Sequence, residues 1–347
     1  MAKLLETPYG TRDFLPQEAA AKRATEQKIF GLFASFGYEE VVTPTMEYLE
    51  TLTTSSGRAI ESQLFKMFDL KNRTLALRHE MTTPIARLTV NRLKDSPLPL
   101  KLSYNANVFR FRTNQPGRHC EFYQAGVELL GVSNSFADAE VIALAAQALK
   151  VSGLADFKIC LGQVEFAGGL MENLSTDVQA QIKSAIERHD IVALNSLNID
   201  DALKIIPTLQ GGREILTAAQ SIANNERSRK ALDNLTEIYR LLEIYGVADK
   251  ITFDLGLIRD FEYYTGMIFE AYAAGVGYSL AGGGRYDNML KDFGAACPAT
   301  GFALGIERIL SARHFQGVVE DSQVKDFYLS YAAGLEGDAI KNAAEFR

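Results

Sequence analysis

The sequence predicts an α+β fold in which an antiparallel sheet is flanked by helices and interrupted by a helical insertion. Residues 103–112 and 118–130 alternate between polar and apolar side chains around a polar turn, which is typical of an antiparallel hairpin. From about 166 to 246 the apolar residues take helical spacing. Strand-like sequence resumes at Lys250 and runs through most of the remaining chain.

The length of the chain favours more than one structural unit. A single core rarely grows beyond about 250–300 residues, and this chain has 347. We expect a core over 1–322 that includes the helical insertion at about 166–246. A predicted strand at 326–332 and a helix at 338–347 then form only a partial αβ unit over 323–347.

Composition excludes several classes of protein. The net charge of −7 argues against a broad basic surface for nucleic acid. Cys120, Cys160 and Cys297 are widely spaced and indicate neither a metal site nor a disulfide framework, which fits a reducing compartment. No apolar run is long enough to span a membrane. We expect a cytoplasmic protein without a metal or cofactor.

The first part of the chain alternates helices with short strands. Gly37 is a natural helix end, Pro44 suits a strand at an edge or interface, and Pro84 is favoured in a first helical turn. The predicted elements are a loop (8–16), a helix (about 17–36), a short strand (37–44), a hairpin (65–69 and 74–78) and a helix (84–93).

The rest of the chain begins with the long hairpin. Ser135 to Asp138 form a capping-type start for an apolar helix that ends near Lys150. After the insertion, strands are predicted at 250–270, 276–280 and 281–287, followed by a helix at 301–310. On that helix, Gly301, Gly305 and Arg308 would share one face.

Two patterns place polar groups together. Period two puts Arg110 and Arg112 on one face of their strand, and it points Gln124 and Glu128 into one pocket on the returning strand. The polar groups that precede the apolar run 267–269 are Arg259, Asp260, Glu262, Tyr263 and Tyr264. An arginine fork beside two tyrosines suits a small zwitterion, although an ordinary strand end with a surface ion pair explains these residues equally well.

The glycine run 282–284 is a third signal. Consecutive glycines in a strand cost conformational entropy, so we expect close approach of this backbone to another group.

Taken together, these segments resemble the catalytic core of class II aminoacyl-tRNA synthetases, and among them histidyl-tRNA synthetase. The resemblance covers nearly the whole chain. Segment 9–16 is similar to the N-terminal signature, and 37–44 resembles motif 1, whose proline lies at the dimer interface. Segments 109–128 and 301–308 resemble motifs 2 and 3, while 254–270 and 281–287 resemble the two histidine-specific signatures.

The resemblance implies two sets of site residues. Arg118 and Arg308 resemble the arginines that contact phosphate in the synthetases. The family's histidine-binding residues fall on Glu80, Thr82, Arg110, Gln124, Glu128, Arg259, Tyr263 and Tyr264.

The chain also departs from the synthetases. Arg112 replaces an acidic residue that contacts ATP, and Asp260 and Met81 fill positions where the synthetases have glycine. Only the first strand and helix of an anticodon-binding domain are expected. This combination resembles the synthetase paralogues that serve as regulatory subunits of the short-form ATP phosphoribosyltransferase.

That family resemblance implies a non-catalytic protein in the first step of L-histidine biosynthesis. Such a protein forms a dimer, associates with the short catalytic subunit, is required for its activity and responds to L-histidine. Two alternatives stay open: a histidyl-tRNA synthetase core without its anticodon-binding domain, and an RNA-binding relative. The acidic balance of the chain makes tRNA an unexpected partner.

Overall fold

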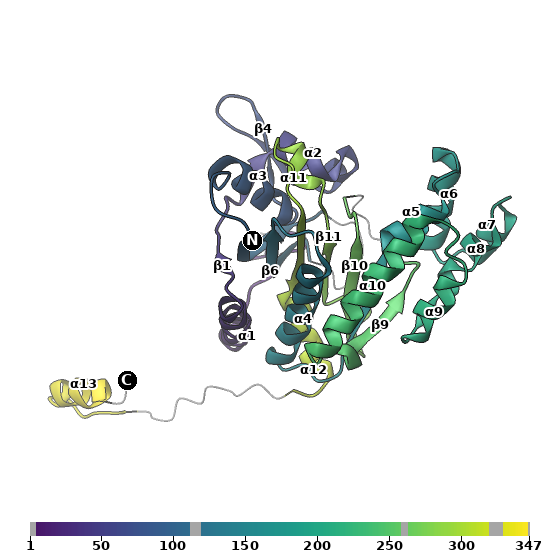
Figure 1. The fold of residues 1–347 in the computed structure, drawn as a ribbon. Coiled ribbons are helices and arrows are strands. Elements are labelled where there is room, and N and C mark those ends of the chain that lie inside the picture. Colours follow the sequence, from purple (N-terminus) through teal and green to yellow (C-terminus); the bar gives the residue numbers. More distant parts are fainter. Residues whose placement is uncertain (1–4, 112–118, 258–262, 319–328, 346–347) are drawn as a thin grey trace.

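A computed structural model describes residues 5–111, 119–257, 263–318 and 329–345. Figure 1 shows its fold. Its strands are β1 (Glu39–Glu40), β2 (Met46–Tyr48), β3 (Lys66–Phe68), β4 (Thr74–Leu77), β5 (Leu100–Phe109), β6 (Glu121–Leu130), β7 (Lys158–Gln163), β8 (Gln210–Gly211), β9 (Ile251–Asp254), β10 (Met267–Tyr272), β11 (Ala281–Arg285) and β12 (Ala299–Gly305).

Helices occur along the whole described chain and are most numerous between β7 and β9 (Figure 1). They are α1 (Pro16–Ser35), α2 (Leu49–Ser56), α3 (Thr82–Arg92), α4 (Ser135–Val151), α5 (Val164–Leu170), α6 (Thr176–Glu187), α7 (Ile191–Ser196), α8 (Asp201–Lys204), α9 (Glu214–Gln220), α10 (Glu226–Ile244), α11 (Met289–Asp292), α12 (Ile306–Phe315) and α13 (Glu336–Glu345). Short 3₁₀ helices are η2 (Arg58–Gln63), η3 (Ile206–Thr208) and η4 (Ala248–Lys250).

A large sheet organises the molecule. In the described part of the chain, nine strands lie in the order β1-β5-β6-β12-β11-β10-β7-β9-β8. Neighbours pair antiparallel except for β1 with β5 and β7 with β9. Strands β5 and β6 form the hairpin that alternation predicts, and β1 lies at the edge as expected for a strand followed by Pro44. The predicted sheet with flanking helices is confirmed.

The two faces of this sheet carry different cores. Val127 and Leu129 on β6 join the main core with α1, α4, α10 and α12, and Figure 1 shows α4 and α10 crossing the sheet. Because strand residues alternate, Gln124 and Glu128 point to the opposite face. A second core lies there, built on α3 and α11 with Tyr286. The polar residues predicted on β6 therefore lie beneath this second core.

A smaller sheet has the order β2-β4-β3 in the described chain. Residues paired directly across antiparallel strands point to the same side. Ala76 and Glu47 are such a pair, and both are buried. The opposite side carries large apolar residues that are only partly buried or are exposed. We call it the outer face; its residues are Met46, Tyr48, Met67, Leu75 and Leu77.

The prediction of one helix at 301–310 is wrong, because β12 continues to Gly305 and α12 begins only at Ile306. The glycines allow close packing within the sheet, and β12 pairs with both β6 and β11. Gly301 lies directly opposite Glu128 and Gly284. Helical spacing of the glycines was therefore a misleading signal, since glycine serves strand contacts here.

Three other predictions need correction. Residues 276–280 form bends and irregular backbone instead of a strand, after a turn at 274–275 in which Gly275 adopts a φ of +85°. Residues 329–332 do not form the C-terminal strand expected at 326–332, whose first three residues lie outside the described chain. The cap of α4 is Asn134, whose Oδ1 accepts from the Ala137 N–H at 3.1 Å. Asp138 has a different role, described below.

Among the described residues, no helix combines the length and the hydrophobicity that crossing a bilayer requires.

Candidate functional site

Glu128 lies near the end of β6, and its carboxylate is buried on the face that supports α3. The residue is only 1% exposed. Its partner on β12 is Gly301, where a Cβ atom would lie 1.9 Å from Glu128 Oε2. Gly126 makes similar room for the ring of Tyr104, whose hydroxyl oxygen would lie 2.3 Å from a Cβ atom there. These glycines allow a carboxylate and a tyrosine to lie directly against the sheet.

Hydroxyl groups surround the Glu128 carboxylate. The Tyr286 hydroxyl donates a hydrogen bond to Oε2, and the Thr82 side chain at the start of α3 also hydrogen-bonds to it. Tyr263 packs edge-on against Tyr286 with ring centroids 5.9 Å apart, and it contacts Tyr264 at 4.7 Å. The site therefore has aromatic walls, with hydroxyl groups near the carboxyl group of Glu128.

Burial raises the pKa of Glu128 to about 8. Hydrogen bonds from Tyr286 and Thr82 lower this pKa, and the nearby Glu80 carboxylate raises it. In the described structure the carboxyl group is therefore largely protonated at neutral pH. A cationic ligand at this position would favour its ionised form.

Glu80 uses its carboxylate to anchor the beginning of α3. The backbone N–H groups of Thr82 and Thr83 donate to it at 2.6 and 3.0 Å. These N–H groups belong to the first turn of the helix, where the backbone has no intrahelical acceptor. Glu80 thus fixes the position of Thr82 while it adds negative potential beside Glu128.

Gln124 lies one strand repeat away from Gly126 and on the same face of β6 as Glu128. Its Oε1 is buried and accepts no hydrogen bond from the described residues. A buried acceptor without a donor costs about 1–3 kcal/mol. A ligand N–H group at this position would remove that cost.

Arg110 follows the end of β5 and lies beside the same site. Its Nε donates to the His79 carbonyl oxygen at 2.8 Å, and its guanidinium lies 5.4 Å from the centroid of the Phe122 ring. His79 is fully buried, which lowers the pKa of its imidazole to about 4. Arg110 is therefore a cation next to a neutral histidine.

The glycine run in β11 makes room for a site residue. A Cβ atom on Gly284 would lie 2.8 Å from Cδ1 of Tyr264 and 2.6 Å from the Met267 carbonyl oxygen. The expectation that this backbone approaches another group closely is confirmed. The approach places Tyr264 over the middle of the sheet, on the side of Glu128.

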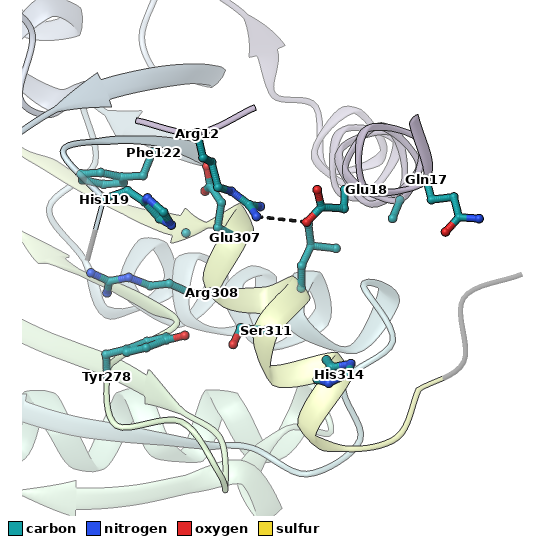
Figure 2. Close-up of a pocket in the computed structure, with 13 residues that line it drawn as sticks. Arg12, Gln17, Glu18, His119, Phe122, Tyr278, Glu307, Arg308, Ser311 and His314 are labelled. Atoms are coloured by element: carbon teal, nitrogen blue, oxygen red, sulfur yellow. Dashed lines mark hydrogen bonds and ion pairs between the residues drawn. The ribbon is translucent and has the colours of Figure 1, made fainter. Parts of the chain in front are cut away.

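A cavity of about 510 Å³, which we call the Arg308 cavity, lies beside Phe122 (Figure 2). It lies between the segment at Arg12, helix α1 and helix α12, and Arg308 extends into it (Figure 2). Its lining residues are Arg12, Gln17, Glu18, Ala21, His119, Phe122, Tyr278, Gly305, Glu307, Arg308, Leu310, Ser311 and His314.

The charged groups of this cavity are held by neighbouring residues. Arg12 pairs with Glu18 at 3.0 Å, and Arg308 Nη1 donates to the Ser279 carbonyl oxygen at 2.5 Å. Glu307 accepts from the Tyr123 N–H at 3.0 Å with both oxygens. Two arginines at one cavity give it the potential to hold an anion.

The structure gathers Glu80, Thr82, Glu128, Tyr263 and Tyr264 around one site. Gln124 and Arg110 border this site, whereas Arg308 belongs to the Arg308 cavity. Arg259 and Arg118 lie outside the described residues, as do Arg112 and Asp260.

The sequence did not identify Tyr104 and Tyr286 as site residues. The Tyr286 hydroxyl donates to Glu128, and Tyr104 is close enough for Glu128 to contribute to raising its pKa. Tyr104 lies on the same face of β5 as Leu102 and Ala106, and it carries no distinctive signal among them. Tyr286 directly follows the glycine run, and its position there was the available signal. Among the described residues, no cluster of His, Cys, Asp and Glu could hold a metal ion.

Comparison with known proteins places this geometry in a family. Residues 10–309 match the family model described as Histidyl-tRNA synthetase. A protein from Moorella thermoacetica named "ATP phosphoribosyltransferase regulatory subunit" is 44% identical over 353 aligned residues, which cover 99% of this chain and 90% of the relative. A protein of the same name from Halothermothrix orenii is 43% identical, with 99% and 84% covered.

A solved structure gives the same result. A crystal structure from Bacillus halodurans C, described as "an ATP phosphoribosyltransferase regulatory subunit/histidyl-tRNA synthetase", superposes with a TM-score of 0.88 at 34% identity. The alignment covers 99% of this chain and 90% of that one. The chain therefore belongs to the family of ATP phosphoribosyltransferase regulatory subunits, which shares the fold of histidyl-tRNA synthetase.

Proposed function

We propose that this chain is the regulatory subunit of a short-form ATP phosphoribosyltransferase. It assembles with the short catalytic subunit, is required for its activity and makes the first step of L-histidine biosynthesis sensitive to L-histidine. The single observation that carries the histidine part of the proposal is the buried Glu128, which is surrounded by hydroxyl groups and faces a site with an unsatisfied acceptor on Gln124.

Histidine has the groups that this site lacks. Its imidazole N–H and its ammonium group are donors, which suit the Glu128 carboxylate and the Gln124 Oε1. The imidazole ring fits between tyrosine walls, and its carboxylate suits an arginine fork. The proposed histidine-binding residues are Glu80, Thr82, Arg110, Gln124, Glu128, Arg259, Tyr263 and Tyr264.

A synthetase core is the second candidate function, favoured by the cavity at Arg308. The replacements at Arg112 and Asp260 argue against ATP activation, because they put a cation in place of an acceptor and add negative charge beside a triphosphate. Histidine-dependent exchange of pyrophosphate into ATP would establish the synthetase. Its absence under conditions in which histidine binds favours the regulatory subunit.

Self-association as a dimer is also part of the proposal. The outer face of the small sheet presents large apolar side chains, with Met46 and Tyr48 exposed. Apolar faces of this kind commonly mark interaction sites. A second copy of the chain is the proposed occupant, because β2 directly follows segment 37–44, which resembles the synthetase motif whose proline lies at the dimer interface. A sedimentation mass of a single chain would contradict this.

Calorimetric titration of L-histidine tests the regulatory proposal. We expect binding to the chain alone, and a different affinity once the short catalytic subunit is bound. Coupling of this kind is reciprocal, so histidine must change the affinity between the subunits by the same factor. Equal histidine affinity in both states would remove the regulatory claim, and absence of binding in both would remove the histidine site.

A further inference from the structure

Arg285 ends β11 and forms a buried ion pair with Asp138 of α4. Its Nη2 lies 2.8 Å from Asp138 Oδ1, and the two side chains are 8% and 1% exposed. Strand alternation sends Arg285 to the α4 face of the sheet and the next residue, Tyr286, to the face of Glu128. Arg285 is thus adjacent in the chain to a wall of the proposed histidine site but lies on the opposite face.

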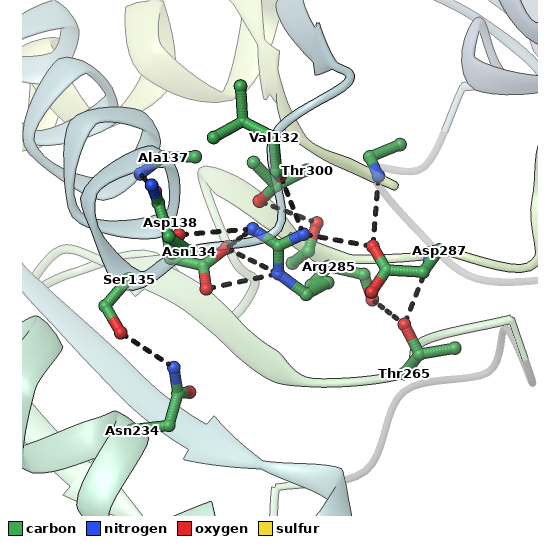
Figure 3. Close-up of polar contacts among 12 residues, drawn as sticks. Val132, Asn134, Ser135, Ala137, Asp138, Asn234, Thr265, Arg285, Asp287 and Thr300 are labelled. Atoms are coloured by element: carbon green, nitrogen blue, oxygen red, sulfur yellow. Dashed lines mark hydrogen bonds and ion pairs between the residues drawn. The ribbon is translucent and has the colours of Figure 1, made fainter. Parts of the chain in front are cut away.

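The guanidinium contacts several separate segments (Figure 3). Besides Asp138, Nη1 donates to the Val132 carbonyl oxygen at 3.1 Å and to Asp287 Oδ1 at 3.0 Å. Nη2 donates to the Asn134 carbonyl oxygen at 3.5 Å. The segment before α4, the first turn of α4 and the end of β11 are therefore held by one planar group.

The same network holds the segment that carries the other tyrosines. The Thr265 N–H donates to the Arg285 carbonyl oxygen at 2.8 Å, and the Asp287 N–H donates to Thr265 Oγ1 at 2.9 Å. A Cβ atom on Gly266 would lie 3.0 Å from Arg285 Cδ, so this backbone packs on the arginine stem. Thr265 directly follows Tyr264, whose ring lies against Gly284.

The network is anchored to the helices beyond α4. Ser135 Oγ accepts from Asn234 Nδ2 of α10 at 3.1 Å, and Asn234 Oδ1 accepts from Gln163 Nε2 at 2.9 Å. The Val164 N–H, next to Gln163, donates to the Gly266 carbonyl oxygen at 3.1 Å. Hydrogen bonds and the short backbone stretches between them thus form a closed path from Gly266 through α10 and α4 and back to Arg285.

We propose that the Arg285–Asp138 pair is a positioning device for the histidine site: it fixes Tyr286 against Glu128, together with Thr265, which hydrogen-bonds to the residues on both sides of Tyr286. The inference rests on the proposed function, because it assumes that histidine binds at Glu128. A buried ion pair gives little net stability compared with well-packed apolar residues of the same size. It contributes a defined geometry, because its hydrogen bonds hold the segment before α4, the first turn of α4 and the end of β11 in fixed relative positions.

A double-mutant cycle on histidine affinity tests this role. Tyr286→Phe removes the hydroxyl that donates to Glu128. Asp138→Asn removes the charge that pairs with Arg285 and keeps the size of the side chain. We expect each variant to bind L-histidine about 10-fold more weakly in calorimetry with the full chain. If Asp138 acts through Tyr286, the double variant is also about 10-fold weaker, whereas independent effects would multiply to about 100-fold.

Glu140→Gln is the matched control. It changes a carboxylate to an amide on the same helix, but at a partly exposed ion pair with Lys101. The histidine affinity of this variant should stay within about 2-fold of that of the wild type. If Asp138→Asn does not fold, Thr265→Val takes its place in the cycle. Its hydroxyl links Arg285 and Asp287, and we expect the same non-additivity with Tyr286→Phe.

Two results overturn the inference while the histidine site survives: wild-type affinity in Asp138→Asn, or fold-changes that multiply in the double variant. Absence of histidine binding to the wild-type chain, alone and with the short catalytic subunit, overturns both the proposed function and the inference.

Discussion

Glu128 and Asp138 are equally buried, each 1% exposed, yet their carboxylates are stabilised in different ways. Asp138 has the guanidinium of Arg285 at 2.8 Å. Among the described residues, those that act most on Glu128 are the hydroxyl groups of Tyr286 and Thr82 and the like charge of Glu80. Burying a carboxylate costs several kcal/mol unless a cation compensates it.

This difference distinguishes a carboxylate with a cation inside the fold from the one that we propose as part of the histidine site. Asp138 is paired with the Arg285 cation within the fold, so its negative charge is compensated without a ligand. Burial raises the pKa of Glu128 to about 8, so this group holds a proton at neutral pH, and we propose that a cationic ligand would favour its ionised form. The compensated Asp138 lies on the α4 side of the large sheet, and the uncompensated Glu128 lies on the opposite face.

The largest expected effect is on stability at Asp138. Replacing Asp138 by Ala leaves the Arg285 guanidinium buried without its main partner, and we expect the free energy of unfolding to fall by about 3–5 kcal/mol. Urea unfolding followed by circular dichroism measures it. A loss of stability below about 1 kcal/mol would mean that the Asp138 carboxylate is not needed to compensate the buried Arg285.

The pH dependence of stability gives the next effect. The pKa of Glu128 is raised from 4.5 to about 8, so between these values the folded chain holds a proton that the unfolded chain has lost. The free energy of unfolding therefore decreases as pH rises, by about 1.4 kcal/mol per pH unit at most, or about 2 kcal/mol between pH 6 and pH 8.

Glu128→Gln should remove this decrease, because an amide does not titrate. Unfolding of the wild type and the variant at several pH values isolates the contribution, since all other groups are common to both. A constant difference between the two proteins from pH 6 to pH 8 would show that Glu128 is already ionised in the free site.

The smallest effect is expected at Glu140, a third carboxylate, which lies on α4 with Asp138. Glu140 is partly exposed, pairs with Lys101 at 2.8 Å and accepts from the Tyr38 hydroxyl at 2.9 Å. Glu140→Gln keeps the acceptor and removes a partly screened charge, so we expect a loss of less than about 1 kcal/mol. Thermal unfolding of both variants measures this difference. A loss of stability in Glu140→Gln as large as that in Asp138→Ala would show that burial does not set the cost of removing these charges.

Local pattern was sufficient to predict the framework of the site. Alternation on 103–112 and 118–130 predicts the β5–β6 hairpin and places Gln124 and Glu128 on one face. The glycine run in β11 predicts a close approach, which Tyr264 and Gly284 make. Both signals lie within a single strand or hairpin, where geometry follows from period two.

Contacts between distant segments were not predictable in this way. Asp138 reads as a residue in a helix cap, and its partner Arg285 is 147 positions away. The role of Gly301 depends on the register of β12 against β6, which places it opposite Glu128. Without that register, the glycine spacing in 301–310 suggests a helix. Tyr104 is likewise identified only by the strands that surround it.

The measurement that tests the central claim most directly is calorimetric titration of L-histidine into wild-type, Glu128→Ala and Glu140→Gln proteins, each folded at the same pH. We predict binding to the wild type and to Glu140→Gln with similar affinity, and no detectable binding to Glu128→Ala, because the buried carboxylate for the ligand's donor is gone. Unchanged histidine affinity in Glu128→Ala would contradict the account.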